Sequence, residues 1–338
     1  MRVARLHHPG DIRLSDEPWP VEAPAGQVVV RVTAVGLCGS DLHWFGEGGI
    51  GDAGLARPLV LGHEMAGVIV DGPNRGQRVA IDPAQPCGHC EFCRAGHPNL
   101  CPNIRFAGHG DCDGGLRDAL SWPADRLHPL PDDVSDAAGA LLEPLGVALH
   151  GLDLGHVRLG ATVAVIGCGP IGLLTIQAAR AAGAVSVFAV EPLEHRRRAA
   201  LDVGADRAFT PDEAHQGAIA EATAGRGVDV ALEYAGTDDG VTLGMVAARP
   251  GGRVVLGGIP SEDRTSFPAS LARRKGLTLA LVRRMKDVYP RALALVGRGL
   301  IAVEPLVGQR FPLDEVAAAF TAAAARTSLK TVVDVSTS

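Results

Sequence analysis

The sequence predicts an α/β fold in which a doubly wound parallel sheet follows a β-rich region. Strand-like and helix-like segments alternate between about residues 160 and 285, and a glycine-rich motif joins the first of these strands to the first helix. Before it, residues 1–135 contain short apolar runs that are bounded by Gly, Pro and Asp, a pattern typical of strands and turns. Alternation indicates a parallel sheet, because parallel strands need long crossover connections. A chain of 338 residues is long enough for two domains.

The β-rich region is expected to hold strands at 27–36 (QVVVRVTAVG), 65–70 (MAGVIV) and 77–82 (QRVAID). Its first residues, MRVARLHHPGDIRL, also indicate a strand. They lack the apolar core of a secretory signal, so a cytoplasmic location is expected. Ser135 or Asp136 is expected to cap a helix through 137–152.

The alternating region gives six strand candidates: 162–167 (TVAVIG), 185–190 (VSVFAV), 207–210 (RAFT), 228–234 (VDVALEY), 253–258 (RVVLGG) and 277–282 (LTLALV). After about residue 285 come two helix-like segments and a closing strand, KTVVDV, and we expect this tail to return to the first domain. The predicted domains are therefore 1–146 completed by 285–338, and 147–284.

One segment has a second interpretation, as a membrane span. Residues 159–179 carry no charge over 21 positions. Glycines and a proline interrupt the middle of the segment, however, and its flanks are ordinary. A buried parallel strand that runs into a helix explains the pattern better.

The glycine-rich motif is a dinucleotide-binding fingerprint. Gly167, Gly169 and Gly172 form G-x-G-x-x-G between an apolar strand and a helix, and Glu191 ends the next strand, 19 positions after Gly172. Such glycines let the backbone approach a pyrophosphate at a helix N-terminus, and the carboxylate accepts hydrogen bonds from the ribose hydroxyls. The pattern favours NAD, because a carboxylate repels the 2′-phosphate of NADP. Within the motif, the expected cofactor-binding residues also include Pro170 and Ile171.

The basic run HRRR, residues 195–198, argues against this preference for NAD. An arginine here, Arg196 in particular, is of the kind that holds a 2′-phosphate, and the alternative is a solvated helix face. The choice between NAD and NADP therefore stays open at this point, with NAD preferred.

Four of the seven cysteines lie within sixteen residues, at Cys87, Cys90, Cys93 and Cys101. A disulfide framework is typical of short secreted chains, whereas four thiolates at this spacing satisfy tetrahedral Zn²⁺. We favour a structural zinc, with a disulfide or redox role as the alternative. A closed site of four thiolates does no chemistry. The net charge of −6 indicates neither a nucleic acid nor a membrane partner.

Three further stretches carry residues that are able to bind a metal or move a proton. The first, GLCGSDLHWFGEG, contains Cys38, Ser40 and His43; the second, LGHEMAG, contains His63 and Glu64; the third, LLEPLGVALH, contains Glu143. Each has an ordinary alternative on its own: a small buried cysteine, a core histidine, or a helix charge that reaches solvent.

Together these stretches, the four-cysteine loop and the fingerprint resemble the zinc-dependent medium-chain dehydrogenase/reductase family over nearly the whole chain. CGSDLH, PCGHCEFC, EPLGVALH and FPLDEVAAAF look most like its polyol branch, that of sorbitol, xylitol and L-idonate dehydrogenases. The resemblance implies a GroES-like catalytic domain with a structural zinc lobe, a Rossmann domain, two zinc ions per chain, NAD, and a homotetramer or homodimer.

The resemblance also implies roles. Cys38, His63, Glu64 and Glu143 would hold or adjoin a catalytic zinc, and Glu143 stands where alcohol dehydrogenases have a cysteine ligand. Ser40 and His43 would relay the substrate proton to solvent. Trp44 and Glu143 are the expected substrate contacts, and Trp44 departs from the tyrosine of many polyol dehydrogenases. The remaining expected cofactor contacts are Gly258, Ile259 and Arg283.

The implied reaction oxidises a secondary alcohol of a polyol or sugar acid, with zinc as Lewis acid and NAD as hydride acceptor, in a cleft between the domains. Two alternatives remain: an amino-alcohol dehydrogenase, and a non-catalytic NAD-binding relative. Of the other cysteines, Cys112 is expected at the surface, with a redox thiol as the alternative. Cys168 is expected to be a small filler beside the pyrophosphate.

Overall fold

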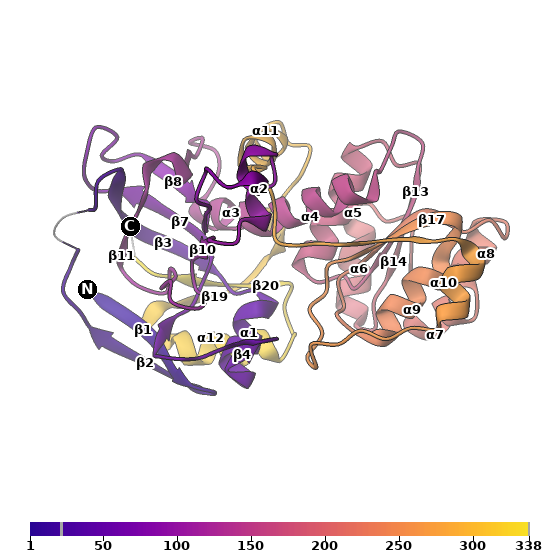
Figure 1. Ribbon diagram of the computed structural model, residues 1–338, viewed down its shortest axis with the longest axis horizontal. Coiled ribbons are helices and arrows are strands. Elements are labelled where there is room, and N and C mark those ends of the chain that lie inside the picture. Colours follow the sequence, from indigo (N-terminus) through magenta and orange to yellow (C-terminus); the bar gives the residue numbers. More distant parts are fainter. Residues whose placement is uncertain (21–22, 337–338) are drawn as a thin grey trace. The chain divides into compact units, whose positions relative to one another are not determined.

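A computed structural model describes residues 1–20 and 23–336, and the chain divides into two compact units (Figure 1). The first unit consists of Met1–Glu143 and Tyr289–Ser338, and the second of Pro144–Val288. The boundaries expected from the sequence, after residues 146 and 284, differ from these by three and four residues.

The first unit is β-rich. Its strands are β1 (Arg2–His8), β2 (Asp11–Asp16), β3 (Gln27–Gly36), β4 (Gly49–Ile50), β5 (Ala53–Gly54), β6 (Leu59–Val60), β7 (Glu64–Ile69), β8 (Arg78–Ile81), β9 (Ala84–Gln85), β10 (Arg105–Phe106), β11 (Ala119–Pro123), β12 (Leu127–Pro129), β19 (Val307–Pro312) and β20 (Lys330–Asp334). Its helices are α1 (Gly39–Glu47), α2 (Glu91–Arg94), α3 (Asp136–Ala140), α11 (Tyr289–Gly297) and α12 (Val316–Ala324), with short 3₁₀ turns at Pro98–Leu100, Ala124–Arg126, Glu304–Leu306 and Leu313–Glu315.

The main sheet of this unit is built around β3, which is rich in β-branched residues and mostly buried. The strand order is β12-β8-β7-β3-β20-β19, and β11 also pairs with β3. β3 runs antiparallel to β7 with Gly36 opposite Glu64, and antiparallel to β20 with Gly36 opposite Val332. This register brings the end of β3, the start of β7 and the start of β20 to the same place. The C-terminal tail therefore contributes strands to the first unit.

The single helix expected through 137–152 is two helices, α3 and α4 (Leu142–Gly155). Ser135 caps α3, because its Oγ accepts the N–H of Ala138 at 3.0 Å. The break has a backbone cause: Pro144 has no N–H to donate to the carbonyl of Ala140, and its ring would clash with that carbonyl in a continuous helix. Starting α4 at Leu142 places Pro144 in a first turn, where the missing donor costs nothing.

The second unit is a doubly wound parallel sheet. Its strands are β13 (Thr162–Ile166), β14 (Ser186–Val190), β15 (Arg207–Phe209), β16 (Val228–Glu233), β17 (Ala248–Leu256) and β18 (Thr278–Leu281). They pair in the order β15-β14-β13-β16-β17-β18, all parallel. The helices that belong to it are α4, α5 (Pro170–Ala181), α6 (Glu194–Asp202), α7 (Pro211–His215), α8 (Ala218–Ala222), α9 (Asp238–Ala247) and α10 (Ala269–Lys275). The strand order reverses at β13, as in a Rossmann fold, so the predicted α/β fold class is confirmed.

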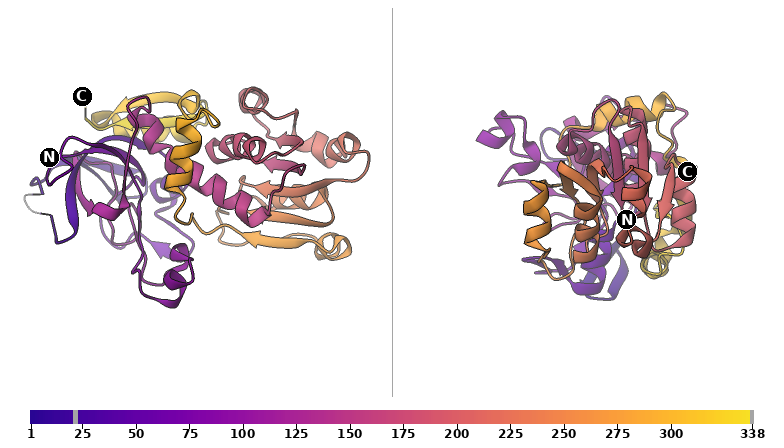
Figure 2. Two further views of the ribbon diagram at one scale, coloured as in Figure 1. Left: turned by 90° about the horizontal axis from the view of Figure 1, so that it is seen from above. Right: turned by 90° about the vertical axis from the view of Figure 1, so that its right-hand side faces the viewer.

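Helices cover both faces of this sheet, as Figure 2 shows. On one face, Gly151 and Gly155 of α4 lie against Leu232 and Val230 of β16. On the other face, α9 packs against alternate residues of the same strand, because Gly244 lies near Ala231. Both faces of the sheet are therefore covered by helices, which explains why its strands are continuous apolar runs instead of alternating apolar and polar residues.

The uncharged segment 159–179 forms β13 and most of α5. Within residues 1–20 and 23–336, no helix is long and apolar enough to span a membrane. The strand-and-helix interpretation of this segment is therefore confirmed.

We expect Gly172→Ala to destabilise the second unit, because an added Cβ at this position would lie 2.0 Å from the carbonyl oxygen of Gly167. Overpacking of this kind costs about 1–3 kcal/mol. The free energy of unfolding, measured by urea titration, checks the expectation.

Gly244→Ala is the matched control, since it is also a glycine in a helix of this unit. Its added Cβ would meet a Val254 methyl group at 3.3 Å and Cβ of Ala231 at 3.7 Å, and the gain in helix propensity, up to about 1 kcal/mol, offsets these contacts. Equal stability of the two variants would contradict the close-approach argument.

Candidate active site

The first unit brings Cys38, His63 and Glu64 together. One donor atom from each side chain lies within 4.8 Å of the others. Cys38 lies two residues after the end of β3 and is the N-cap of α1, while His63 and Glu64 stand where β7 begins. The β3–β7 register with Gly36 opposite Glu64 is the reason that two motifs distant in the sequence meet.

Asp41, a residue that sequence analysis did not single out, ties these two segments together. It is fully buried, and its Oδ2 accepts the N–H of Cys38 at 2.9 Å while its Oδ1 accepts the N–H of Gly62 at 3.1 Å. The same Oδ1 lies 3.4 Å from Nδ1 of His63. One carboxylate thus fixes the backbone beside both expected ligands and faces the imidazole.

The arrangement fits a zinc ion. Because Nδ1 of His63 faces a carboxylate, the proton belongs on Nδ1, and Nε2 keeps the lone pair that a metal needs. Burial lowers the pKa of His63, but the Asp41 carboxylate outweighs it and raises the pKa well above the usual value, so the ring is a strong base. A thiol, a basic imidazole and a carboxylate form a donor set that suits Zn²⁺ and leaves a coordination position for substrate.

Glu64 has a buried cation beside it, Lys330, which sequence analysis also missed. Nζ of Lys330 donates to Oε1 of Glu64 at 2.6 Å and to the carbonyl of Leu37 at 2.8 Å. Nζ also lies 2.5 Å from Oε2, and both side chains are almost fully buried. An alanine Cβ at Gly36 would lie 2.1 Å from Oε2 of Glu64, so only glycine leaves room for the pair. A signal existed in the composition, since the chain has only three lysines.

Glu143 lies close enough to this group to respond to its charges. Burial raises the pKa of the Glu143 carboxyl to about 7, and the charges of His63 and Glu64 act on it in opposite directions. The donor atoms within 4.8 Å of one another, however, come from Cys38, His63 and Glu64. Direct ligation of a metal by Glu143 therefore stays a prediction.

The two residues of the expected proton relay occupy different environments. Ser40 is buried, and its Oγ lies 3.4 Å from Nε2 of His63. His43 lies one turn further along α1, where Nδ1 contacts Oε1 of Glu47 at 3.0 Å. Because the Glu47 side chain is half exposed, His43 stands at the solvent end of such a path and Ser40 at its buried end.

Trp44, an expected substrate contact, is fully buried in the core of the first unit. Its indole N–H donates to Nε2 of His109 at 3.4 Å, and the two rings meet edge to face. His109 and Phe106 both lie edge-on or tilted near the ring of His63. His109 thus lies between Trp44 and His63 and contacts both rings. The contact of Trp44 with substrate stays a prediction.

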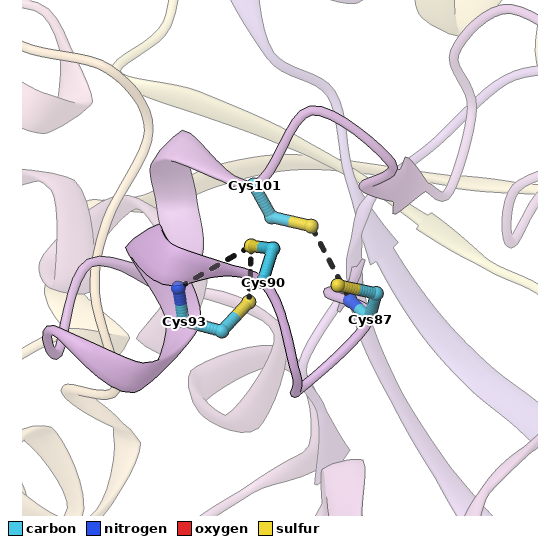
Figure 3. A group of neighbouring side chains, drawn as sticks. All are labelled: Cys87, Cys90, Cys93 and Cys101. Atoms are coloured by element: carbon cyan, nitrogen blue, oxygen red, sulfur yellow. Dashed lines mark hydrogen bonds between the residues drawn. The ribbon is translucent and has the colours of Figure 1, made fainter.

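The four clustered cysteines converge on one point (Figure 3). They lie in an excursion from the β-rich unit that carries α2 (Figure 2). Sγ of Cys90 lies 3.4 Å from Sγ of Cys93, and the N–H of Cys87 donates to Sγ of Cys101 at 3.3 Å. Main-chain N–H groups of His89 and Cys90 lower the pKa of Cys87 to about 6. Burial raises the pKa of the neighbouring Cys93 to about 12. The convergence of the four sulfurs is therefore what fits a tetrahedral Zn²⁺ site.

The second unit presents the fingerprint in the expected setting. Gly167 has φ +89°, and Gly169 is the N-cap of the twelve-residue helix α5. An added Cβ at Gly169 would meet no heavy atom closer than 3.8 Å, so the N-terminus of α5 is open to a pyrophosphate. The atom at 3.8 Å is Nη1 of Arg196, which places this guanidinium beside the same open space.

Glu191 is buried at the end of β14. Its Oε2 accepts the N–H of Cys168 at 2.8 Å, and its Oε1 accepts the N–H of Leu193 at 3.1 Å. Cys168 is fully buried, in agreement with a filler role. Of the other expected cofactor contacts, Gly258 packs on Gly236, Ile259 is partly exposed, and Arg283 is exposed after β18.

The expectation of a surface position for Cys112 is wrong. Its side chain is buried in the core of the first unit, and burial raises the pKa of its thiol. The glycines around it made the segment look like an exposed loop. They are there because the loop packs on other backbone: an added Cβ at Gly114 would lie 2.2 Å from the carbonyl oxygen of Gly62.

A β-rich unit with a Cys-His-Glu site and a four-cysteine loop, in one chain with a Rossmann unit, defines a zinc-dependent dehydrogenase. Family models agree. The chain matches the alcohol dehydrogenase GroES-like domain over residues 24–132 and the zinc-binding dehydrogenase domain over residues 170–298. The chain belongs to the zinc-dependent medium-chain dehydrogenase family, in its polyol dehydrogenase branch.

Relatives in this branch match over nearly their whole length. The chain is 37% identical over 334 residues to a probable D-xylulose reductase A from Arthroderma otae, covering 95% of this chain and 94% of that protein. It is 36% identical over 324 residues to sorbitol dehydrogenase from Bos taurus, covering 93% and 90%. Among solved structures, it is similar to a zinc-binding dehydrogenase from Sinorhizobium meliloti with NADP bound, at 32% identity and TM-score 0.88 over 99% of both chains.

We expect Cys93→Ser to lower the zinc content of the purified protein by one ion per chain, because the loop then offers three thiolates instead of four. The melting temperature should fall as well, since the metal pins the loop. Elemental analysis and thermal unfolding check this expectation.

Cys112→Ser is the control, as it alters a buried thiol outside the cluster. It should keep the zinc content of the unaltered chain. A Cys93→Ser protein with undiminished zinc would contradict the assignment of the loop.

We expect Lys330→Met to cost about 3–5 kcal/mol of unfolding free energy in the chelated protein, because Glu64 is left buried without its cation. With zinc bound, the loss should be smaller, since the metal supplies positive charge beside the same carboxylate. Denaturant titrations with and without a chelator measure both values.

Lys275→Met is the matched control, because Lys275 donates only to the carbonyl oxygens of Met245, Val246 and Ala248. Its effect should not depend on zinc. Equal zinc dependence of the two variants would show that the Glu64–Lys330 pair is not linked to the metal.

Proposed function

We propose that this chain is an NAD-linked dehydrogenase that oxidises a secondary alcohol of a polyol or sugar acid, using zinc. The observation that carries the proposal is the convergence of Cys38, His63 and Glu64 within 4.8 Å, with the carboxyl of Glu143 nearby. A purely structural site would be closed by four protein ligands, whereas this one supplies three.

Cys38, His63 and Glu64 would hold the catalytic zinc. When bound there, zinc would supply Lewis acidity toward the hydroxyl oxygen of the substrate. Asp41 keeps the imidazole of His63 in the tautomer that leaves Nε2 available, and Lys330 balances the charge of Glu64. A carboxylate donor in place of a second thiolate leaves more positive charge on the metal, which favours a more acidic hydroxyl.

Ser40 and His43 would remove the proton of that hydroxyl. Ser40 is buried beside His63, so its Oγ is placed to accept the proton at the reacting end. His43 pairs with the half-exposed Glu47, which supports its role as the group that delivers the proton to solvent. Positioned proton transfer of this kind contributes roughly 10²–10⁴-fold to rate.

The second unit would hold NAD, which when bound would supply the hydride acceptor. The open N-terminus of α5 suits the pyrophosphate, and Glu191 suits the ribose hydroxyls. Arg196 beside Gly169 stands close to where the pyrophosphate would lie, so its charge does not by itself argue for a 2′-phosphate. We therefore propose NAD over NADP, although a similar structure was solved with NADP.

The substrate class is supported by relatives named as a sorbitol dehydrogenase and a D-xylulose reductase. Contacts of Trp44 and Glu143 with the polyol are part of the same proposal. So is assembly as a homotetramer or homodimer, which derives from the family resemblance. A cytoplasmic location belongs to the proposal as well, because metal-binding thiols need a reducing compartment.

We expect the zinc-loaded protein to reduce NAD⁺ in the presence of a polyol or aldonic acid, and to prefer NAD⁺ to NADP⁺. A panel of substrates with each cofactor, followed by the absorbance of the reduced nicotinamide, checks this. Ser40→Ala should lower kcat roughly 100-fold or more while it keeps zinc and NADH binding.

Ser135→Ala is the matched control, because Ser135 caps α3 and contacts Glu304 instead of the metal site. It should lose stability but not kcat. If the unaltered protein binds zinc and NADH yet oxidises no member of the panel, the proposed function is wrong and a non-catalytic NAD-binding role gains support.

A further inference from the structure

Glu233 is a buried carboxylate that the proposed reaction does not use. It is the last residue of β16, and its side chain is 1% exposed. Its Oε1 accepts the N–H of Gly236 at 2.7 Å. Burial raises the pKa of Glu233, while hydrogen bonds from the main-chain N–H groups of Gly236, Ala235, Gly258 and Thr237 lower it. The carboxylate thus accepts an N–H of the loop after β16, and its Oε2 lies beside Gly258 of the loop after β17, where an added Cβ would be 2.9 Å away.

These two loops, 234–237 and 257–259, touch each other at their backbones. An added Cβ at Gly236, where φ is +70°, would lie 2.4 Å from the carbonyl oxygen of Ile259. An added Cβ at Gly258 would lie 2.1 Å from the nitrogen of Gly236 and 2.9 Å from Oε2 of Glu233. The backbone carbonyl of Glu233 also accepts the N–H groups of Gly257 and Gly258, at 2.8 and 3.1 Å. One residue therefore holds both loops through its side chain and its main chain.

The fingerprint loop, which follows β13, contacts the loop 234–237. The N–H of Tyr234 donates to the carbonyl of Ile166 at 2.8 Å, and an added Cβ at Gly167 would lie 2.8 Å from the nitrogen of Ala235. The loop after β16 thus contacts both the loop after β13 and the loop after β17 at the carboxyl edge of the sheet. In doubly wound sheets, ligands bind outside this edge, where the strand order reverses.

We propose that Glu233 is a positioning residue for the nucleotide site: its carboxylate fixes the loops 234–237 and 257–259 in the conformation that receives the cofactor. The inference rests on the nucleotide site of the proposed function. A carboxylate offers only acceptors to the buried N–H of Gly236 and to the backbone beside Oε2, whereas an amide side chain would turn an NH₂ donor toward one of them. The preorganised loops spare the cofactor the cost of ordering them on binding.

Glu233→Gln tests this proposal, because it keeps the volume and removes the charge. We expect the Kd for NADH, measured by fluorescence titration, to rise roughly 10- to 100-fold, as charge-assisted hydrogen bonds are the strong ones. In the cofactor-free protein, amide hydrogen exchange should accelerate at Gly236, whose N–H donates to the carboxylate, and not at Gly257, whose N–H donates to the main-chain carbonyl of Glu233. This second readout does not depend on turnover.

Gly240→Ala is a second variant in case Glu233→Gln does not fold. Gly240 lies in the first turn of α9, so alanine favours the helix, but its Cβ would press on Oε1 of Glu233 at 2.9 Å. We expect a several-fold rise in the Kd for NADH together with faster exchange at Gly236.

Asp229→Asn is the matched control. Asp229 lies near the other end of β16, where it contacts Thr162, Arg226 and Arg249. Its replacement should lower the melting temperature and leave the Kd for NADH unchanged. If Glu233→Gln folds and binds NADH as tightly as the unaltered chain, or if Asp229→Asn weakens NADH binding equally, the proposal is overturned. If the unaltered chain does not bind NADH, the proposed function itself has failed.

Discussion

The pairing of β3 with β7 and β20 around one buried ion pair is the constraint on which the first unit depends. Gly36 stands opposite Glu64 and Val332 in this sheet, and the space left by its missing side chain holds Glu64 and Lys330. A one-residue slip would send Glu64 to the other face of the sheet and separate Cys38 from His63. A buried carboxylate without a cation is costly, so a register that separates Glu64 from Lys330 is penalised.

In the second unit, close contacts between backbone segments fix the site, whereas in the first unit a buried ion pair does so. Its glycines at the carboxyl edge of the sheet let the loop after β16 approach the loops after β13 and β17 closely. Glu233 supplies acceptors there: its carboxylate accepts the N–H of Gly236, and its main-chain carbonyl accepts those of Gly257 and Gly258. In both units a buried carboxylate, Glu64 or Glu233, organises backbone from several strands. Such networks cost stability if any member is removed, and they give a site one defined geometry.

Much of the fold and of the site could be predicted because the relevant signals are local. The spacing of Cys87, Cys90, Cys93 and Cys101 describes a site within one loop, and the fingerprint describes one strand-to-helix turn. The helix expected through 137–152 was wrong in one respect, although the cause, Pro144, was visible in the sequence. The interpretation of Cys112 was wrong because glycine-rich segments occur both in exposed loops and where two backbones touch.

The sequence by itself determined the alternation that makes a parallel sheet, the glycines of the dinucleotide fingerprint, and the residues that we predict to bind metal. Only the tertiary structure decided which groups orient them. Asp41 faces the imidazole of His63, Lys330 pairs with Glu64, and Glu233 accepts an N–H from the loop after β16. The physical reason is the distance along the chain. Lys330 and Glu64 are 266 positions apart, and their contact exists only because strands from the two ends of the chain share a sheet. Local chemistry can be read from residue types and spacing, whereas such partners depend on a register that no short segment encodes.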